Sequence, residues 1–300
     1  MSNQVPSMAS TSTKTAEAEL IEAKATLLIA SLRAIGPVAV AYSGGTDSAL
    51  VLAAAVKASG ADRVLAVTAV SESLASGELD AAAAFAAGLG VRHLTERTTE
   101  LSSPGYRANG RDRCYFCKSH VLDAIGHLAR EHGFEQLATG TNAEDAADPF
   151  RPGIRAGSER GVHTPLRDAS LSKAQVRQIA LHWDLPVWDK PATPCLASRI
   201  RYGVEVTSFR LAQVDRAERA VRQVLASAGL RPRDLRVRHL GDSARIEVDP
   251  HLVAAVRDLP ETFDAVAAAG FGAAPVTVDG FRSGRLNVEQ PAQAVRGSCR

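Results

Sequence analysis

The chain has 300 residues, 45% of them hydrophobic, and a formal net charge of +2 at pH 7. This composition is typical of a globular protein, and the nearly neutral charge argues against a DNA-binding or membrane-surface protein. We expect no membrane partner, because no apolar run reaches the roughly 18 residues that span a bilayer. Residues 1–16 lack the apolar core of a secretory signal. They predict a flexible tail on a cytoplasmic enzyme.

Strand and helix patterns alternate along residues 17–200. Apolar runs predict strands at 37–42, 64–70, 91–94 and 137–140. Alanine-rich segments with helical spacing predict helices at 48–59, 74–89 and 121–132, and Ser172 is a suitable cap for a further helix. This order predicts an α/β domain in which helices cover both faces of a parallel sheet.

The pattern changes after residue 200. A long helix is predicted at about 208–226, followed by alternating strands at 235–240 and 244–248 with a turn at 241–243 between them. Two short helices and a strand at 275–278 complete the segment. Residues 201–290 therefore predict a smaller α+β domain for substrate binding or oligomerisation, and residues 291–300 predict a second flexible tail.

A polar, glycine-rich turn joins the first strand to the first helix. Its residues are Ser43, Gly44, Gly45, Thr46, Asp47 and Ser48. Such a turn presents backbone N–H groups and a helix N-terminus to phosphate, while Asp47 suits the helix dipole or a bound Mg²⁺. The turn lacks the lysine of a Walker A loop and the glycine spacing of a dinucleotide site. In isolation it would also suit an ordinary loop.

Polar residues also follow other predicted strands. Ser71 follows the second strand, and Thr141 and Asn142 follow the fourth. Ligands of parallel sheets bind at the carboxyl ends of strands, so these residues and the 43–48 turn predict one nucleotide pocket. Three nearby charges are weaker candidates, each equally consistent with a solvated loop: Asp145 for the metal, and Arg151 and Arg155 for a nucleotide.

Three cysteines lie in chemically suggestive surroundings. Cys114 and Cys117 form a Cys-x-x-Cys pair, which would suit zinc, an iron–sulfur cluster or a redox dithiol, and Lys118 is beside them. Cys195 lies between prolines and Arg199, which would favour its thiolate; the alternative is a small buried hydrophobic residue.

Four motifs together resemble one family. They are the 43–48 turn, Arg-Cys-Tyr-Phe-Cys-Lys at 113–118, Pro-Cys-Leu-Ala-Ser-Arg-Ile at 194–200 with Tyr202-Gly203, and Asp-Gly-Phe-Arg-Ser-Gly at 279–284 with Asn287. In this order they resemble the LarE-type ATP-dependent sulfur transferases, members of the PP-loop ATP pyrophosphatase superfamily. The likeness runs from about residue 20 to 290.

The resemblance implies a reaction and a pathway. ATP would transfer AMP to a carboxylate of pyridinium-3,5-biscarboxylic acid mononucleotide while the 43–48 turn holds the departing pyrophosphate. The activated carboxylate would then become a thiocarboxylate. Family members make the nickel-pincer nucleotide, the cofactor of lactate racemase, and the resemblance also implies a ring-like homo-oligomer.

The family is divided over the sulfur source. One subgroup sacrifices the cysteine equivalent to Cys195, and the other holds a [4Fe-4S] cluster on three cysteines. This chain has cysteines at all three positions, Cys114, Cys117 and Cys195, which favours the cluster. The motif specifies ligands only, so zinc or an empty site stays an alternative. ATP, Mg²⁺ and the cluster are the expected cofactors.

Arginines of the second domain are candidates for the substrate phosphate. Arg236 and Arg238 alternate on a predicted strand and so point to one face. The resemblance supports this role and adds Arg199, whereas the alternative is a solvent face with paired acids. Glu218 and Glu247 are weaker candidates for metal contact.

Other functions remain open at this stage. An amide-forming or RNA-thiolating enzyme of the same superfamily is one, although the charge of +2 gives no sign of a nucleic-acid partner. A non-catalytic nucleotide-binding module stabilised by zinc is another.

Overall fold

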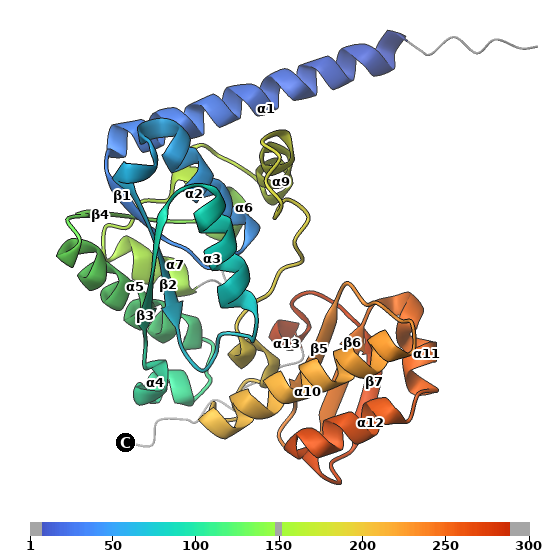
Figure 1. Ribbon diagram of the computed structural model, residues 1–300. Coiled ribbons are helices and arrows are strands. Elements are labelled where there is room, and N and C mark those ends of the chain that lie inside the picture. Colours follow the sequence, from blue (N-terminus) through green and yellow to red (C-terminus); the bar gives the residue numbers. More distant parts are fainter. Residues whose placement is uncertain (1–7, 148–151, 289–300) are drawn as a thin grey trace, which may run out of the picture. The chain divides into compact units, whose positions relative to one another are not determined.

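The computed structural model describes residues 8–147 and 152–288 (Figure 1). The chain divides into two compact units. Met1–Glu100 and Asp112–Thr193 make the first unit, and Leu101–Arg111 and Pro194–Arg300 make the second. Each unit has its own sheet, of four strands in the first and three in the second. The two units are described separately below.

The sheet of the first unit is parallel throughout. Its strands are β1 (Val38–Ala41), β2 (Val64–Val70), β3 (Arg92–Arg97) and β4 (Gln136–Thr139). Their order in the sheet is β3-β2-β1-β4, with every neighbouring pair parallel. The carboxyl end of β1 therefore lies between those of β2 and β4.

Helices cover both faces of this sheet (Figure 1). They are α1 (Met8–Ile35), α2 (Thr46–Ser59), α3 (Glu78–Gly88), α5 (Arg113–Glu131), α6 (Ala143–Ala147), α7 (Pro152–Ser158), α8 (Pro165–Asp168) and α9 (Lys173–His182). Val38 and Val40 of β1 pack in one core with Leu28 of α1 and Leu52 of α2. Ala39 and Ala41 belong to a second core that includes α5. The alternation of side chains along β1 produces these two layers. The predicted α/β class, with the parallel sheet of a PP-loop domain, is confirmed.

Four helices differ from the sequence prediction. Helix α1 begins at Met8, inside the segment predicted as a flexible tail. Helix α5 begins at Arg113, so Cys114 and Cys117 are in its first turns. Asp145 and Arg155, predicted in loops, are in α6 and α7. Helices α6 and α7 have only 5 and 7 residues, which is too short to show a hydrophobic periodicity, so tertiary packing stabilises them.

The second unit is built on a mixed sheet. Its strands are β5 (Leu235–His239), β6 (Ala244–Val248) and β7 (Val276–Gly280), and its helices include α4 (Pro104–Arg107), α10 (Ser208–Ser227), α11 (Val253–Arg257), α12 (Glu261–Val266) and α13 (Arg285–Val288). The predicted antiparallel β5–β6 pair is observed, and β7 joins β6 in parallel. Val237, Ile246 and Val278 are buried on one face, and α10 packs against β5. The opposite face carries charged side chains.

The segment around Asn109 is a part of the second unit that the sequence did not predict. Asn109 is fully buried, and its Nδ2 donates to the carbonyls of Arg201 and Val204 at 2.9 and 2.8 Å. The Gly203 N–H donates to the Asn109 carbonyl in return, at 3.1 Å. These bonds explain why residues 101–111 group with residues far along the chain.

Cys195 and Arg199 also belong to the second unit, because the units divide between Thr193 and Pro194, a few residues before the predicted boundary at 200. Ile200 forms a parallel bridge with His239 of β5, and the Arg201 N–H donates to the His239 carbonyl at 2.9 Å. The segment that carries Cys195 is therefore joined to the edge of β5.

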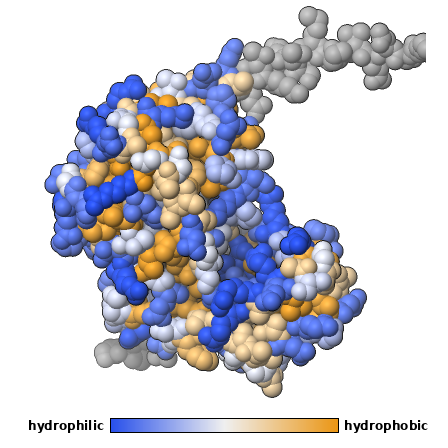
Figure 2. Space-filling view, in the orientation of Figure 1, coloured by the Kyte–Doolittle hydropathy of each residue, from blue (hydrophilic) through white to orange (hydrophobic). Residues whose placement is uncertain are grey.

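The visible face of the first unit mixes apolar and polar residues (Figure 2). Large apolar side chains exposed on this unit include Leu20 and Leu27 on α1 and Leu181 on α9. Within the two described ranges, no helix is long and apolar enough to cross a bilayer. Homo-oligomerisation stays a prediction.

Candidate active site

The 43–48 loop follows β1 directly and opens α2. Gly44 has a φ of 73°, a conformation that glycine adopts without strain. The Ser48 hydroxyl donates to the Gly45 carbonyl at 3.1 Å and accepts from the Ser43 N–H at 3.2 Å. Gly45 is the N-cap of α2 and provides no side-chain cap, so the first turn keeps N–H groups for an anion. Hydrogen bonds within the loop therefore stabilise it, and no side chain caps the N-terminus of α2.

The end of β4 lies against this loop. A Cβ placed on Gly140 would be 2.6 Å from the Ser48 nitrogen and 2.8 Å from the Asp47 carbonyl carbon, so only glycine fits there without backbone movement. The Asn142 Nδ2 donates to Asp47 Oδ1 at 3.3 Å. The structure therefore brings together two groups of residues, at 43–48 and 140–142, that the sequence assigned to one pocket.

Two other predicted pocket residues have local partners. The Thr141 hydroxyl lies 3.3 Å from that of Thr139. Ser71 is one residue past β2, and its hydroxyl lies 2.8 Å from that of Ser73. Because β2 and β4 are the neighbours of β1, both residues are at strand ends adjacent to the loop.

Asp47 is in an environment that disfavours its charge. Burial raises its pKa, and the nearby Asp145 carboxylate raises it further, whereas the hydrogen bond from Asn142 and the cations Lys173 and Arg177 act in the opposite direction. Asp145 is only 8% exposed, and its Oδ1 lies 3.1 Å from Lys173 Nζ. The alternative of Asp145 as a solvated loop acid is therefore wrong.

A divalent cation would relieve this electrostatic cost. Mg²⁺ prefers carboxylate oxygens and commonly uses one or two of them, together with phosphate oxygens. Asp47 at the phosphate-facing helix terminus, with Asp145 near it, fits that requirement. The donor set is hence suitable for a magnesium ion that accompanies a nucleotide.

Cys114 and Cys117 lie three residues apart in α5, a spacing that places both on one side of the helix. Neither cysteine is in a disulfide; Cys114 is exposed, and Cys117 is half-buried with its Sγ 4.0 Å from Glu100 Oε1. Lys118 follows them, and burial lowers the pKa of its ammonium while Cys117 acts to raise it. A Cβ on Gly153 would lie 3.2 Å from the Cys114 carbonyl oxygen, so α7 packs closely against this turn.

Cys195 is a half-buried free thiol of the second unit. Its carbonyl accepts from the Ser198 N–H at 2.9 Å and from Arg199 at 3.2 Å. Arg199, only 1% exposed, also donates to the Pro194 carbonyl. The guanidinium thereby holds the backbone on both sides of the Pro194–Cys195 peptide bond.

The three-cysteine centre stays a prediction. Cys114 and Cys117 belong to the first unit and Cys195 to the second. Among the residues that the structure describes, no three His, Cys, Asp or Glu side chains gather into a metal-binding group.

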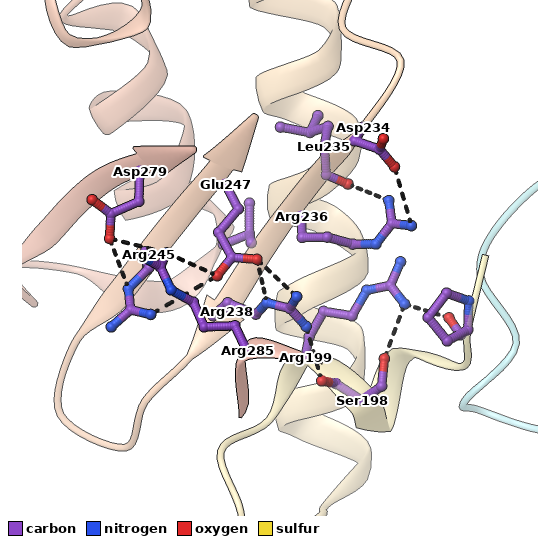
Figure 3. Close-up of polar contacts among 12 residues, drawn as sticks. Ser198, Arg199, Asp234, Leu235, Arg236, Arg238, Arg245, Glu247, Asp279 and Arg285 are labelled. Carbon is purple, nitrogen blue, oxygen red and sulfur yellow. Dashed lines mark hydrogen bonds and ion pairs between the residues drawn. The ribbon is translucent and has the colours of Figure 1, made fainter. Parts of the chain in front are cut away.

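The charged side of the second unit's sheet carries a cluster of arginines (Figure 3). We call this surface the arginine face; its residues are Arg199, Arg236, Arg238, Arg245 and Arg285, with the carboxylates Glu218, Glu247 and Asp279. Strand alternation places Arg236 and Arg238 on this side, as predicted. Arg245 and Glu247 share it on β6, the neighbouring strand.

Glu247 is at the centre of the arginine face and is completely buried. Arg238 binds it with Nε and NH2 at 2.9 and 2.7 Å (Figure 3). Arg285 and Arg245 approach its other oxygen at 3.5 and 3.8 Å. Glu247 therefore holds three guanidinium groups in place, and its contact with a metal stays a prediction.

Glu218 has a similar role at the edge of β5. It accepts from Nε and NH2 of Arg199 at 2.9 and 3.2 Å and from the Val237 N–H at 3.0 Å. The metal contact of Glu218 likewise stays a prediction. Arg199 is consequently fixed beside the strand that carries Arg236 and Arg238.

Arg236 differs from its neighbours in its electrostatics. Its side chain is 5% exposed, and its NH1 donates to the Leu235 carbonyl at 2.8 Å, while Asp234 is 3.9 Å from its NH2. Burial, followed by Arg199 and Arg238, lowers its pKa to about 10. An anion bound here would be stabilised by these crowded positive charges. The alternative of a solvent face is wrong for both Arg236 and Arg238, since both are buried.

The remaining sequence candidates are more peripheral. Arg155 lies over the Tyr115 ring at 4.1 Å and pairs with Glu159 at 3.3 Å on the surface of α7. Arg151 lies outside the described residues. Sequence reasoning missed Arg245 and Arg285, although the alternation along β6 was a usable signal for Arg245.

The comparisons with known proteins agree with this architecture. The chain is 35% identical over 274 residues to pyridinium-3,5-bisthiocarboxylic acid mononucleotide synthase of Lactiplantibacillus plantarum, covering 90% of this chain and 95% of that protein. The chain belongs to the LarE-type synthase family. The chain is also similar to an uncharacterised protein of Synechocystis, with 42% identity over 83% of this chain and 91% of that protein.

A more distant likeness involves another enzyme. Argininosuccinate synthase of Halobacterium salinarum is 29% identical over 161 residues, which cover 51% of this chain and 40% of that protein. No family model matches the chain.

Proposed function

We propose that this protein is an ATP-dependent sulfur insertase acting on a carboxylate of pyridinium-3,5-biscarboxylic acid mononucleotide. One observation carries the proposal: the open helix terminus of the 43–48 loop, with Asp47 beside it, occurs in a chain that belongs to the LarE-type family. The relative from Lactiplantibacillus plantarum is named for the bisthiocarboxylic product.

The first step would be adenylation. A carboxylate oxygen of the substrate attacks the α-phosphorus of ATP, and the bond to the β-phosphate oxygen breaks, releasing pyrophosphate. The N–H groups of the 43–48 loop stabilise the charge that develops on the leaving group. Asp47 would hold Mg²⁺, which supplies charge neutralisation between the phosphates. The product is an acyl adenylate, in which AMP is a good leaving group.

The arginine face suits the substrate's phosphomonoester. Arg236 is buried beside Arg199 and Arg238, so a phosphate bound there would meet three neighbouring guanidinium groups. Because Glu247 and Glu218 already hold the neighbouring guanidinium groups, an arriving phosphate meets donors that need little reorganisation. Binding by this remote group would position the carboxylate for reaction.

The second step would transfer sulfur. Cys114, Cys117 and Cys195 would hold a [4Fe-4S] cluster, and its role would be to supply one sulfide beyond the four of its core. Transfer of that sulfide to the acyl carbon would break the bond to AMP and leave a thiocarboxylate. In the alternative, the Cys195 thiolate displaces AMP and forms a thioester. Loss of the Cys195 α-proton and cleavage of its Cβ–S bond then release the thiocarboxylate and leave dehydroalanine.

The test combines anaerobic reconstitution with Cys195→Ala. We expect the variant to release pyrophosphate from ATP in the presence of the mononucleotide but to form no thiocarboxylate. Iron and sulfide bound to the wild type, with intact mass unchanged after turnover, would support the cluster. An intact mass that falls by the elements of H2S at Cys195 would support the sacrificial route.

Two outcomes would reject the proposal. One is thiocarboxylate formation by Cys195→Ala at the wild-type rate. The other is ATP binding without pyrophosphate release, accompanied by stoichiometric zinc, which would instead identify a nucleotide-binding module.

A further inference from the structure

Lys190, which is distant in sequence, forms a hydrogen bond with the backbone of the 43–48 loop. The Lys190 Nζ donates to the Gly44 carbonyl at 2.9 Å and to Glu78 Oε2 at 2.8 Å. The Lys190 and Glu78 side chains are only 20% and 21% exposed. The three groups lie within the first unit, and Glu78 is the first residue of α3. The motif analysis did not identify Lys190 or Glu78.

The segment that carries Lys190 is itself tied to the loop and to α9. We call residues 187–190 the strap. The Thr46 hydroxyl donates to the Val187 carbonyl at 2.7 Å. Arg177 of α9 donates to the carbonyls of Trp188 and Lys190 at 3.1 and 2.8 Å. The strap is therefore held on one side by the core helices and on the other side by the loop.

The contact with Gly44 bears on the direction of a peptide group. A loop that binds an anion through N–H groups must turn its carbonyls away from the anion. Gly44 has positive φ, and glycine peptides reorient readily because no Cβ restricts them. An ammonium that donates a hydrogen bond to the Gly44 carbonyl favours one orientation of the Gly44–Gly45 peptide.

We propose that Lys190 is a positioning residue for pyrophosphate: it holds the Gly44 carbonyl outward so that the Gly45 N–H faces the phosphate. The inference rests on the proposed function, because it takes the loop as the pyrophosphate site. Glu78 keeps the ammonium in place, and the Thr46–Val187 bond aligns the strap with the first turn of α2. Lys190 acts through the loop and does not itself bind phosphate.

The alternative role for Lys190 is direct contact with phosphate. The substitution Glu78→Gln distinguishes this role from the positioning role. If Glu78 holds Lys190 against the Gly44 carbonyl, Glu78→Gln weakens that hold and lowers the affinity for pyrophosphate. If Lys190 binds phosphate directly, Glu78 competes for the ammonium, and Glu78→Gln raises the affinity. The two roles predict opposite signs.

The experiment measures binding of inorganic pyrophosphate with Mg²⁺ by calorimetry, together with ATP–pyrophosphate exchange kinetics and thermal unfolding. We expect Lys190→Met to weaken pyrophosphate binding about tenfold, the size expected for loss of a charge-assisted hydrogen bond. KM for ATP should rise more than kcat falls. Lys190→Arg should recover part of the affinity, because it retains a cationic donor.

The matched control is Lys57→Met. Lys57 Nζ lies over the Trp183 ring at 4.9 Å, so this substitution also removes a packed ammonium of the first unit but leaves the loop contacts intact. We expect pyrophosphate binding to stay at the wild-type value. If Lys190→Met fails to fold, Glu78→Gln alone carries the test through the sign of its effect.

The failures are distinguishable. Wild-type binding by Lys190→Met, or tighter binding by Glu78→Gln, would overturn the role of Lys190 and leave the proposed function standing. Absence of pyrophosphate binding and exchange in the wild-type protein would overturn both.

Discussion

The 43–48 loop of the first unit and the arginine face of the second unit are both suited to anions, yet they use different groups. The loop offers backbone N–H groups, hydroxyls and the open end of α2. The arginine face offers guanidinium groups that buried carboxylates hold in place, above all Glu247. One region therefore supplies partial charges and the other supplies full charges.

This difference matches the two anions of the proposed reaction. Pyrophosphate must leave after it forms, and partial charges on amides stabilise it without a strong permanent attraction. The substrate phosphate stays unreacted and serves as a handle, so full charges with preset geometry suit it.

Asp47→Asn should abolish the function of the loop without unfolding the protein. We expect ATP–pyrophosphate exchange to fall by about 10³-fold, because a magnesium ligand is lost and each tenfold corresponds to ~1.4 kcal/mol. Burial raises the pKa of Asp47, so its ionised form at neutral pH costs folding stability that is recovered as pH falls toward the unfolded pKa. A neutral Asn should therefore leave the melting temperature equal or higher.

The control for Asp47→Asn is Asp62→Asn, which neutralises an exposed carboxylate. It should change neither exchange nor melting. If Asp47→Asn catalysed ATP–pyrophosphate exchange at the wild-type rate, Asp47 would not be a magnesium ligand.

Glu247→Gln should destabilise the arginine face and with it the folded second unit. The substitution leaves Arg238, Arg245 and Arg285 without the central charge of a fully buried carboxylate. We expect a loss of about 3–5 kcal/mol in unfolding free energy, measured by urea denaturation. Glu205→Gln, which removes an exposed partner 3.8 Å from Arg107, should cost less than about 1 kcal/mol. Equal effects of the two substitutions would contradict the assigned role of Glu247.

Gly140→Ala should damage the loop through contact alone. The new Cβ would lie 2.6 Å from the Ser48 nitrogen, so the backbone of α2 or β4 must shift. We expect pyrophosphate affinity to fall by about tenfold or more, since amide direction at the helix terminus sets binding. Gly88→Ala is the control, because nothing lies within 4 Å of a Cβ there. If calorimetry showed wild-type pyrophosphate affinity in both variants, the close approach of Gly140 to the loop would not matter for binding.

Arg236→Met should weaken substrate binding selectively. We expect KM for the mononucleotide to rise by about tenfold while KM for ATP stays constant, because only the phosphate handle loses a donor. A rise in KM for ATP instead would move the phosphate site away from Arg236.

The local sequence predicted much of the first unit. Alternating apolar runs and helical spacing identified the four parallel strands, because strand burial and helix amphipathicity leave periodic marks in the sequence. The 43–48 turn was recognisable because glycines and hydroxyl residues between a strand and a helix are typical of a phosphate-binding turn. The neighbouring strand ends followed from the parallel order.

Contacts between distant segments left no such mark. Asn109 fills its hydrogen bonds with residues 201 and 204, and Lys190 meets Gly44 and Glu78. The prediction placed the helix at 121–132, whereas α5 begins at Arg113 and includes Cys114 and Cys117. Pairing of this kind depends on the folded chain.

The sequence by itself determined the alternation of strands and helices, the glycine turn at residue 43 and the two arginines on one side of β5, because each follows from spacing along the backbone. Tertiary structure decided which charges are balanced. Glu218 and Glu247 form ion pairs with Arg199 and Arg238, and Asp145 is a buried neighbour of Asp47, since burial and ion pairing arise only where separate elements pack together.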